Sequence, residues 1–201
     1  MRYFPVELDV LGRDVLVVGA SGEVVSKIGR LLDAGAQVIV MTTGEIDALV
    51  ERWVSEGRVR LERRQARIDD VDGKALVFVA TSHAAEAQPF FRRALDEGRL
   101  VCTVDRPESS TFVNPAVVRA SGLTMTFASG GTAPGVMRRI REDLEQLFSD
   151  ARFSRFLEVL GRLRAELPRG HRAEKMTAAV QGFRIEASLH FPDWVGRDDA
   201  P

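Results

Sequence analysis

The chain has 201 residues, enough for one domain of ordinary size and a smaller second one. Apolar residues make up 45% and charged residues 28%, as is typical of globular proteins. The 28 basic and 29 acidic side chains nearly cancel, so no overall field attracts nucleic acid or a membrane surface. The single cysteine, Cys102, excludes an intramolecular disulfide and fits a reducing compartment. We expect a cytoplasmic protein, because no apolar run approaches the roughly 20 residues that span a bilayer and the first residues do not resemble a signal peptide.

Short apolar runs alternate with amphipathic segments through the first half of the chain. The runs predict strands over 15–18, 38–40, 59–61, 76–80 and 100–104. Helices are expected between them, over 23–34, 45–56 and 84–97. This alternation predicts an α/β fold, a Rossmann-like parallel sheet with helices on both faces. Such a sheet binds ligands beyond the carboxyl ends of its strands, here at residues 19–24, 41–44, 80–83 and 103–107.

The pattern changes after residue 112. It predicts a helical turn over 115–120, a strand over 123–127, a helix over about 135–147 and a largely helical remainder. One apolar stripe in that remainder comprises Phe153, Phe156, Leu157, Leu160, Leu163 and Leu167. We therefore expect three parts: a Rossmann-like domain over 1–112, a connecting segment over 113–150 and a helical C-terminal domain over 151–201.

A small-residue turn follows the first predicted strand and opens a helix, as in dinucleotide-binding proteins. Free amides and the helix dipole favour a pyrophosphate there. The alternative is a tight turn that binds nothing. The second predicted strand ends without an acid that would bind the ribose hydroxyls and without an Arg or Lys that would bind a 2′-phosphate. The sequence therefore does not select between NAD and its 2′-phosphorylated form. The residues predicted to contact the nucleotide are Gly19, Ala20, Ser21, Gly22, Glu23, Thr43, Gly44, Ala80 and Thr81.

Two further side chains stand at predicted strand ends. Asp105 ends the fifth strand and can act as a general base, the alternative being a turn-capping aspartate before Pro107. His83 ends the fourth strand, and a ligand or acid–base role competes with a purely structural one. His171 and His190 are expected at the surface, and no metal-ligand spacing is present, so we predict no metal site. Cys102 is expected to be a buried strand residue.

A second loop, Ser129-Gly130-Gly131-Thr132, precedes Pro134 and a predicted helix. Exposed amides at such a helix start favour a carboxylate or a phosphate, while the alternative is a loop that only turns the chain. The following arginines, Arg138, Arg139 and Arg141, are most simply a solvated face.

Three segments together point to a known family. They are the entry segment Tyr3-Phe4-Pro5-Val6, the stretch Val104-Asp105-Arg106-Pro107 with Phe112-Val113-Asn114-Pro115, and the loop Ala128-Ser129-Gly130-Gly131-Thr132-Ala133-Pro134. In this order and spacing they resemble the precorrin-2 dehydrogenase/sirohydrochlorin ferrochelatase family, which forms the N-terminal module of siroheme synthases. The resemblance covers residues 1 to about 150.

The resemblance implies an activity in siroheme biosynthesis. Members of the family oxidise precorrin-2 to sirohydrochlorin with NAD⁺, and many then insert Fe²⁺ to give siroheme. Asp105 falls on the family's essential aspartate, so the resemblance implies that it is the catalytic base. Ser129 falls on a serine that some members phosphorylate. The loop residues Ser129, Gly130, Gly131 and Thr132, with His83, are expected to hold the tetrapyrrole substrate. A homodimer formed through residues 113–150 is also implied.

The glycine turn departs from the family, which usually has three consecutive glycines there. The Cβ atoms of Ala20 and Ser21 are expected to crowd a pyrophosphate. This favours the hypothesis that NAD affinity is reduced while macrocycle binding and chelation are retained. Two alternatives to the dehydrogenase therefore stay open: a chelatase only, and a non-catalytic nucleotide- or tetrapyrrole-binding module.

Overall fold

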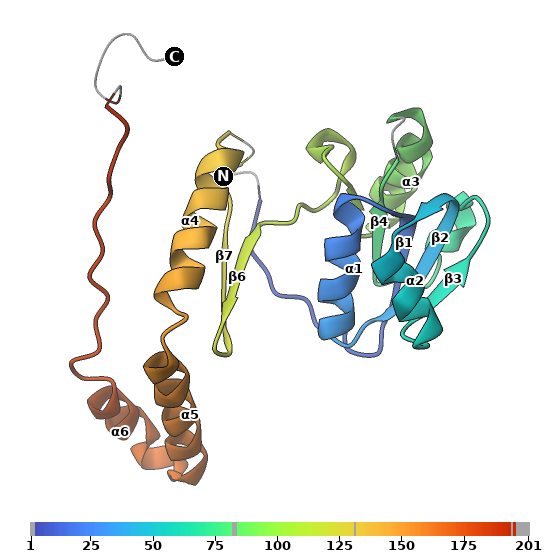
Figure 1. Cartoon of the computed structure of the whole chain (residues 1–201). Coiled ribbons are helices and arrows are strands. Elements are labelled where there is room, and N and C mark those ends of the chain that lie inside the picture. Colours follow the sequence, from blue (N-terminus) through green and yellow to red (C-terminus); the bar gives the residue numbers. More distant parts are fainter. Residues whose placement is uncertain (1–2, 82–83, 131, 194, 196–201) are drawn as a thin grey trace. The chain divides into compact units, whose positions relative to one another are not determined.

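The computed structural model describes residues 3–81, 84–130, 132–193 and 195, and the chain divides into two compact units, Met1–Pro115 and Ala116–Pro201. The first unit contains a five-stranded parallel sheet (Figure 1), with strand order β3-β2-β1-β4-β5. The strand order reverses between β1 and β4. The predicted parallel α/β sheet is therefore confirmed. Its strands are β1 (Asp14–Ala20), β2 (Gln37–Ile46), β3 (Val59–Glu62), β4 (Leu76–Val79) and β5 (Val101–Thr103).

Helices cover both faces of this sheet (Figure 1). Successive side chains of β1 point to opposite faces, so Val15 and Val17 join one core and Leu16 joins the other. The first core includes α1 (Glu23–Asp33) and α2 (Ala48–Ser55), and the second includes α3 (Ala84–Glu97). Two short 3₁₀ helices complete the unit, η1 (Ile68–Val71) and η2 (Pro107–Ser109).

The second strand is longer than predicted. We expected the strand over 38–40 to be followed by residues 41–44 beyond its carboxyl end, but β2 continues to Ile46. The continuation is held because Ala20 pairs with Ile46 after an irregularity between Val18 and Ala20, and because the Asp47 amide donates to the Ala20 carbonyl at 2.9 Å. Thr43 and Gly44 thus lie in an extended strand rather than in a loop.

The second unit begins with an antiparallel pair, β6 (Ala116–Ala120) and β7 (Leu123–Phe127). The helical turn predicted over 115–120 is wrong. Ser121 and Gly122 have φ angles of 52° and 81°, and two consecutive positive φ angles form the tight hairpin turn that matches strand twist. The β-branched residues of Ala116–Ala120 also suit a strand better than a helix. Helices follow the hairpin: α4 (Pro134–Leu147), α5 (Ala151–Glu166), the short η3 (Arg169–His171) and α6 (Arg172–Ala179).

The second unit has little core of its own. Among the described residues of this unit, the buried hydrophobic side chains are Val118 and Phe148. Phe148 contacts Phe153 of α5 with ring centroids 4.8 Å apart, and Phe183 stacks on Phe153 and Phe156. Phe153 and Phe156 of the apolar stripe predicted on α5 thus contact other aromatic rings, and all six residues of the stripe are partly buried. Within the described part of the chain, no helix has the length and apolar character needed to cross a membrane.

Candidate dinucleotide and substrate site

The chain leaves β1 and β4 toward opposite faces of the sheet, and these two strands meet closely at their carboxyl ends. Gly19 has a φ of 104°, and a Cβ atom there would lie 2.9 Å from the Ala80 carbonyl oxygen and 3.2 Å from the Ala80 Cβ. Only glycine therefore fits this position. In open parallel sheets the crevice at such a reversal of strand order is where ligands bind.

The N-terminus of α1 opens at this crevice. Its N-cap is Gly22, with a φ of 66° and no side-chain cap hydrogen bond, and a Cβ atom at Gly22 would meet nothing within 4 Å. By contrast, the amides at the starts of α2 and α5 are capped by Asp47 and Asp150, each with an acceptor oxygen 2.8 Å from a backbone nitrogen. Amides without a side-chain cap beside open space are suited to a pyrophosphate.

The two residues expected to crowd the glycine turn differ in orientation. Ala20 is 1% exposed and its methyl group belongs to the core that includes α1, so it does not project into the crevice. Ser21 is exposed. The expected crowding at Ala20 is therefore wrong, because the irregularity of β1 between Val18 and Ala20 places this residue in the same core as Val15 and Val17.

The other residues predicted on the nucleotide side lie along the same edge of the sheet. Thr43 and Gly44 are exposed, and the Gly44 amide donates to the Thr42 hydroxyl at 3.0 Å. Glu23, in the first turn of α1, is exposed and forms an ion pair with the partly buried Lys27 at 3.8 Å. The Thr81 hydroxyl donates to the Glu86 carboxylate. His83 lies outside the described residues.

Asp105 occupies an unusual backbone conformation at the end of β5. Its φ is 60°, and it is one of two non-glycine residues with positive φ among those described. The Arg106 amide donates to the Thr103 carbonyl at 3.1 Å, which closes a four-residue turn with Asp105 as its third residue. Turns that need a positive φ at this position usually place glycine there. An aspartate held in this state, with its side chain exposed, is a candidate functional residue.

A cluster of buried hydroxyls lies directly beneath this turn. The Thr103 amide donates to the Ser110 hydroxyl at 2.9 Å, and the Thr103 hydroxyl donates to the Ser109 carbonyl at 2.8 Å. From α3, the side-chain amide of Gln88 donates to the Ser109 hydroxyl at 2.9 Å. Sequence reasoning missed these residues, because serines and threonines in a loop carry no signal of burial.

Cys102 is buried in β5, as predicted. Burial raises the pKa of its thiol, and the nearby Lys27 ammonium opposes that rise. A buried thiol of raised pKa is a poor nucleophile, so Cys102 is a structural residue. His171 and His190 are exposed, also as predicted. The described residues contain no group of three or more histidine, cysteine and acidic side chains that could hold a metal.

The second predicted loop is stabilised within the second unit. The Ser129 hydroxyl accepts from the Ala133 amide at 3.1 Å, and the Thr132 hydroxyl donates to the Ser129 carbonyl at 2.7 Å. The N-cap of α4 is Ala133, and it makes no side-chain cap hydrogen bond. Gly130 has a φ of 66°, and Gly131 lies outside the described residues.

The arginines of α4 form the solvated face that was predicted. Each pairs with an acid one helical turn later, at distances of 3.0 to 3.3 Å. The pairs are Arg138–Glu142, Arg139–Asp143 and Arg141–Glu145. They are therefore occupied by local partners rather than free for a ligand.

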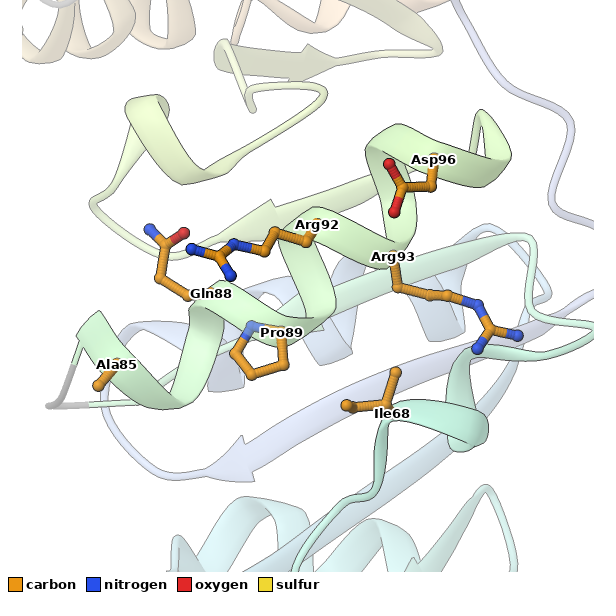
Figure 2. A pocket seen from close by; sticks show the side chains of 7 residues that line it. All are labelled: Ile68, Ala85, Gln88, Pro89, Arg92, Arg93 and Asp96. Atoms are coloured by element: carbon orange, nitrogen blue, oxygen red, sulfur yellow. The ribbon is translucent and has the colours of Figure 1, made fainter.

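An open hollow of about 590 Å³ lies on the outer face of α3 (Figure 2). None of the residues predicted for the nucleotide or the substrate lines it. Of its two arginines, Arg93 is paired with Asp69 and Asp72, at 3.6 and 3.2 Å. The hollow therefore does not coincide with the predicted nucleotide or substrate residues, although its lining residue Gln88 also donates to Ser109. Its lining residues are Ile68, Ala85, Gln88, Pro89, Arg92, Arg93 and Asp96.

The doubly wound sheet, the reversal of strand order between β1 and β4 and the uncapped start of α1 are the architecture of the Rossmann class, in which dinucleotide-binding proteins are common. Residues 6–116 match the model of the family described as "Putative NAD(P)-binding". The chain belongs to this family, and the resemblance predicted from the sequence is confirmed.

Curated relatives are siroheme synthases. The chain is 33% identical over 154 residues to siroheme synthase 2 of Halorhodospira halophila, covering 75% of this chain and 31% of that protein. It is 34% identical over 147 residues to the siroheme synthase of Actinobacillus pleuropneumoniae serotype 3, covering 73% and 30%. The chain thus spans about a third of the length of these relatives.

A solved structure shares the fold. The structure of SirC, precorrin-2 dehydrogenase, matches with a TM-score of 0.77 and 23% identity, covering 90% of each chain. The match therefore extends over both units and is not limited to the parallel sheet.

Proposed function

We propose that this protein acts in siroheme biosynthesis as an NAD-dependent dehydrogenase that oxidises precorrin-2 to sirohydrochlorin. The observation that carries the proposal is the position of Asp105. It lies at the same carboxyl edge of the sheet as the glycine crevice, in a loop held at an unfavourable backbone angle. The siroheme synthase relatives and the fold shared with SirC support the choice of substrate.

The proposed chemistry needs a hydride acceptor and a base. When bound, NAD⁺ supplies the hydride acceptor. Its pyrophosphate would be held by the first amides of α1, and the residues from Gly19 to Glu23 with Thr43, Gly44, Ala80 and Thr81 would surround the nucleotide. Asp105 would accept the proton that the tetrapyrrole loses, because its carboxylate is exposed to an incoming substrate.

The tetrapyrrole carries several carboxylates, which need hydrogen-bond donors. We propose that Ser129, Gly130, Gly131 and Thr132, with His83, hold these groups. The uncapped start of α4 supports this, since helix N-termini favour anions.

Ferrochelation is a second proposed activity. Inserting Fe²⁺ into sirohydrochlorin releases two pyrrole protons, and Asp105 could accept them. Fe²⁺ is here a substrate whose final ligands are the macrocycle nitrogens, so the reaction needs no resident metal site in the protein.

A homodimer formed through residues 113–150 is a further proposal. It is supported by the small core of the second unit and by apolar side chains on α4 that remain exposed. Val136, Ile140 and Leu147 are 55%, 36% and 43% exposed on that helix. A two-stranded hairpin is at best marginally stable by itself, so further apolar burial against a second copy would stabilise this unit. The three-part division, 1–112, 113–150 and 151–201, is retained as the proposed functional organisation.

Of the alternatives, a chelatase with a weakened NAD site loses part of its basis. It depended on crowding by Ala20 and Ser21, and the Ala20 methyl group is buried in the core. The departure from the family then rests on Ser21, whose hydroxyl can itself donate to a phosphate.

Anaerobic absorbance spectra separate the three possibilities. The purified protein is mixed with precorrin-2 and NAD⁺, and separately with sirohydrochlorin and Fe²⁺ or Co²⁺. Oxidation without added metal supports the dehydrogenase. Metal insertion into sirohydrochlorin without any oxidation of precorrin-2 supports the chelatase. Ligand binding without turnover supports a binding module.

A further inference from the structure

The buried polar side chains of the described residues are concentrated at one place. They are Thr103, Ser109 and Ser110, which are 2%, 2% and 5% exposed. Burying a hydroxyl is unfavourable unless it is hydrogen-bonded, and all three are. They lie within or beside the loop that carries Asp105. The hydrogen bonds of these three residues therefore stabilise this loop rather than the hydrophobic core.

Ser110 links the two ends of the Asp105 turn. Its hydroxyl accepts from the Thr103 amide at 2.9 Å and lies 2.9 Å from the Arg106 carbonyl, to which it donates. Thr103 and Arg106 are the first and fourth residues of the turn, and the Arg106 amide closes it on the Thr103 carbonyl. One buried hydroxyl thus holds both ends of the turn.

Asp105 depends on this hold more than an ordinary turn residue does. Its φ of 60° lies in a region that side chains other than glycine rarely adopt, so it persists only where the surroundings enforce it. The side chain is exposed, so packing around it does not enforce the angle. The angle is therefore held by hydrogen bonds, from the Arg106 amide to the Thr103 carbonyl and from the Ser110 hydroxyl to the Arg106 carbonyl.

We propose that Ser110 is a positioning residue for the carboxylate of Asp105. Its hydroxyl keeps the turn closed and so fixes the direction in which the carboxylate meets the substrate. This inference rests on the proposed dehydrogenase function, in which Asp105 is the base. Misplacing a base by about 1 Å can slow a reaction on the order of a hundredfold without changing how the cofactor binds.

Thr111 provides a matched control, because it performs the same structural task away from the turn. Its hydroxyl accepts from the Val101 amide at 2.8 Å and donates to the Arg99 carbonyl at 3.0 Å. Both hydroxyls therefore satisfy amides on the open edge of β5. Only that of Ser110 contacts the residues that close the Asp105 turn.

The test compares Ser110→Ala with Thr111→Val in precorrin-2 oxidation. Ser110→Cys, which keeps the shape of the side chain but replaces the hydroxyl by a weakly hydrogen-bonding thiol, is used in case Ser110→Ala folds poorly. For either Ser110 variant we expect kcat to fall by about tenfold or more. NAD⁺ affinity should stay within about twofold of wild type, because the glycine crevice is untouched. Thr111→Val should keep the wild-type kcat even where it lowers the unfolding temperature.

Amide hydrogen exchange gives a second readout that needs no substrate. The Arg106 amide should exchange faster in Ser110→Ala than in wild type, and at the wild-type rate in Thr111→Val. The inference is overturned if Ser110→Ala keeps its kcat, or if both variants lose activity equally, or if Arg106 exchange is unchanged. A wild-type protein that does not oxidise precorrin-2 contradicts the proposed function instead, and so the two failures are distinct.

Discussion

Gly19 and Ala80 approach each other where β1 and β4 end, and a Cβ atom on Gly19 would stand 2.9 Å from the Ala80 carbonyl oxygen. The contact is with backbone, which cannot rotate away as a flexible side chain would. The ends of β1 and β4 can therefore lie this close together only because residue 19 has no side chain. The nucleotide half of the proposed site depends on that contact.

Gly19→Ala should destabilise the protein and abolish NAD⁺ binding, because the added methyl group forces the two strand ends apart. Gly57→Ala is the matched control, since Gly57 also has a positive φ, of 70°, but nothing lies within 4 Å of an added Cβ. We expect a loss of roughly 1 kcal/mol for Gly57→Ala from backbone strain alone. For Gly19→Ala we expect about 3 kcal/mol or more, measured by urea unfolding. Equal losses would show that the approach to Ala80 is unimportant.

Gly22→Asp should weaken NAD⁺ binding more than Gly22→Asn does. A carboxylate at the α1 N-cap can accept from the first amides and oppose a pyrophosphate there. Gly22→Asn offers the same shape without the charge, and because Gly22 has a φ of 66° and a ψ of −139°, a conformation close to the glycine-only region, both variants carry the same backbone strain. We expect the NAD⁺ dissociation constant to rise by at least about tenfold for Asp and clearly less for Asn, since charge repulsion is the larger effect. Calorimetric titration measures both, and identical values for the two variants would contradict a pyrophosphate at this helix end.

Asp150→Asn should reduce the loss of stability in acid. The Arg152 guanidinium and backbone amide lower the pKa of Asp150 from 3.8 to about 2. A carboxylate whose pKa is lower in the folded state stabilises the protein above its unfolded-state pKa, and this contribution disappears as the pH falls from about 3.8 toward 2. The asparagine variant can still cap α5, so its unfolding free energy should change less across that interval. Urea unfolding at pH 5, 4 and 3 measures the slope, and a slope equal to that of wild type would refute the assignment.

Ile140→Asp combined with Leu147→Asp should dissociate the proposed homodimer. Both side chains are exposed on α4 in a unit with few buried apolar residues, and a charge there would oppose apolar association. Leu95→Asp, at a residue 58% exposed on α3, introduces the same charge in the other unit. Light scattering after size exclusion should give a monomer for the double variant and a dimer for Leu95→Asp. A wild-type monomer would remove the dimer proposal altogether.

Local signals predicted the parallel sheet well. The helix expected over 84–97 is observed with those bounds, because it lies between two buried apolar strands and ends at a glycine of positive φ. In the hairpin at Ala116–Phe127, the second strand was predicted correctly and the first was predicted as a helical turn. Its signal was the Ser121-Gly122 pair between two five-residue runs, a two-residue turn between strands.

The site was harder to predict than the fold. The glycine turn and Asp105 could be found because they follow apolar strands in a known order. The orientation of the Ala20 methyl group could not be read from the turn pattern, since it depends on which face of β1 that residue occupies. The hydroxyls of Thr103, Ser109 and Ser110 gave no signal, because the partners that justify their burial come from backbone geometry and from Gln88, 21 residues away from Ser109.

The most direct test of the account is the rate at which Asp105→Asn oxidises precorrin-2 with NAD⁺ under anaerobic conditions, followed by the absorbance of sirohydrochlorin. Asparagine keeps the size of the side chain and tolerates the positive φ, but it cannot accept a proton as a base. The account predicts an active wild type and a variant slowed by at least about a hundredfold, with NAD⁺ affinity unchanged. A variant that oxidises precorrin-2 at the wild-type rate would contradict the assignment of Asp105 as the base.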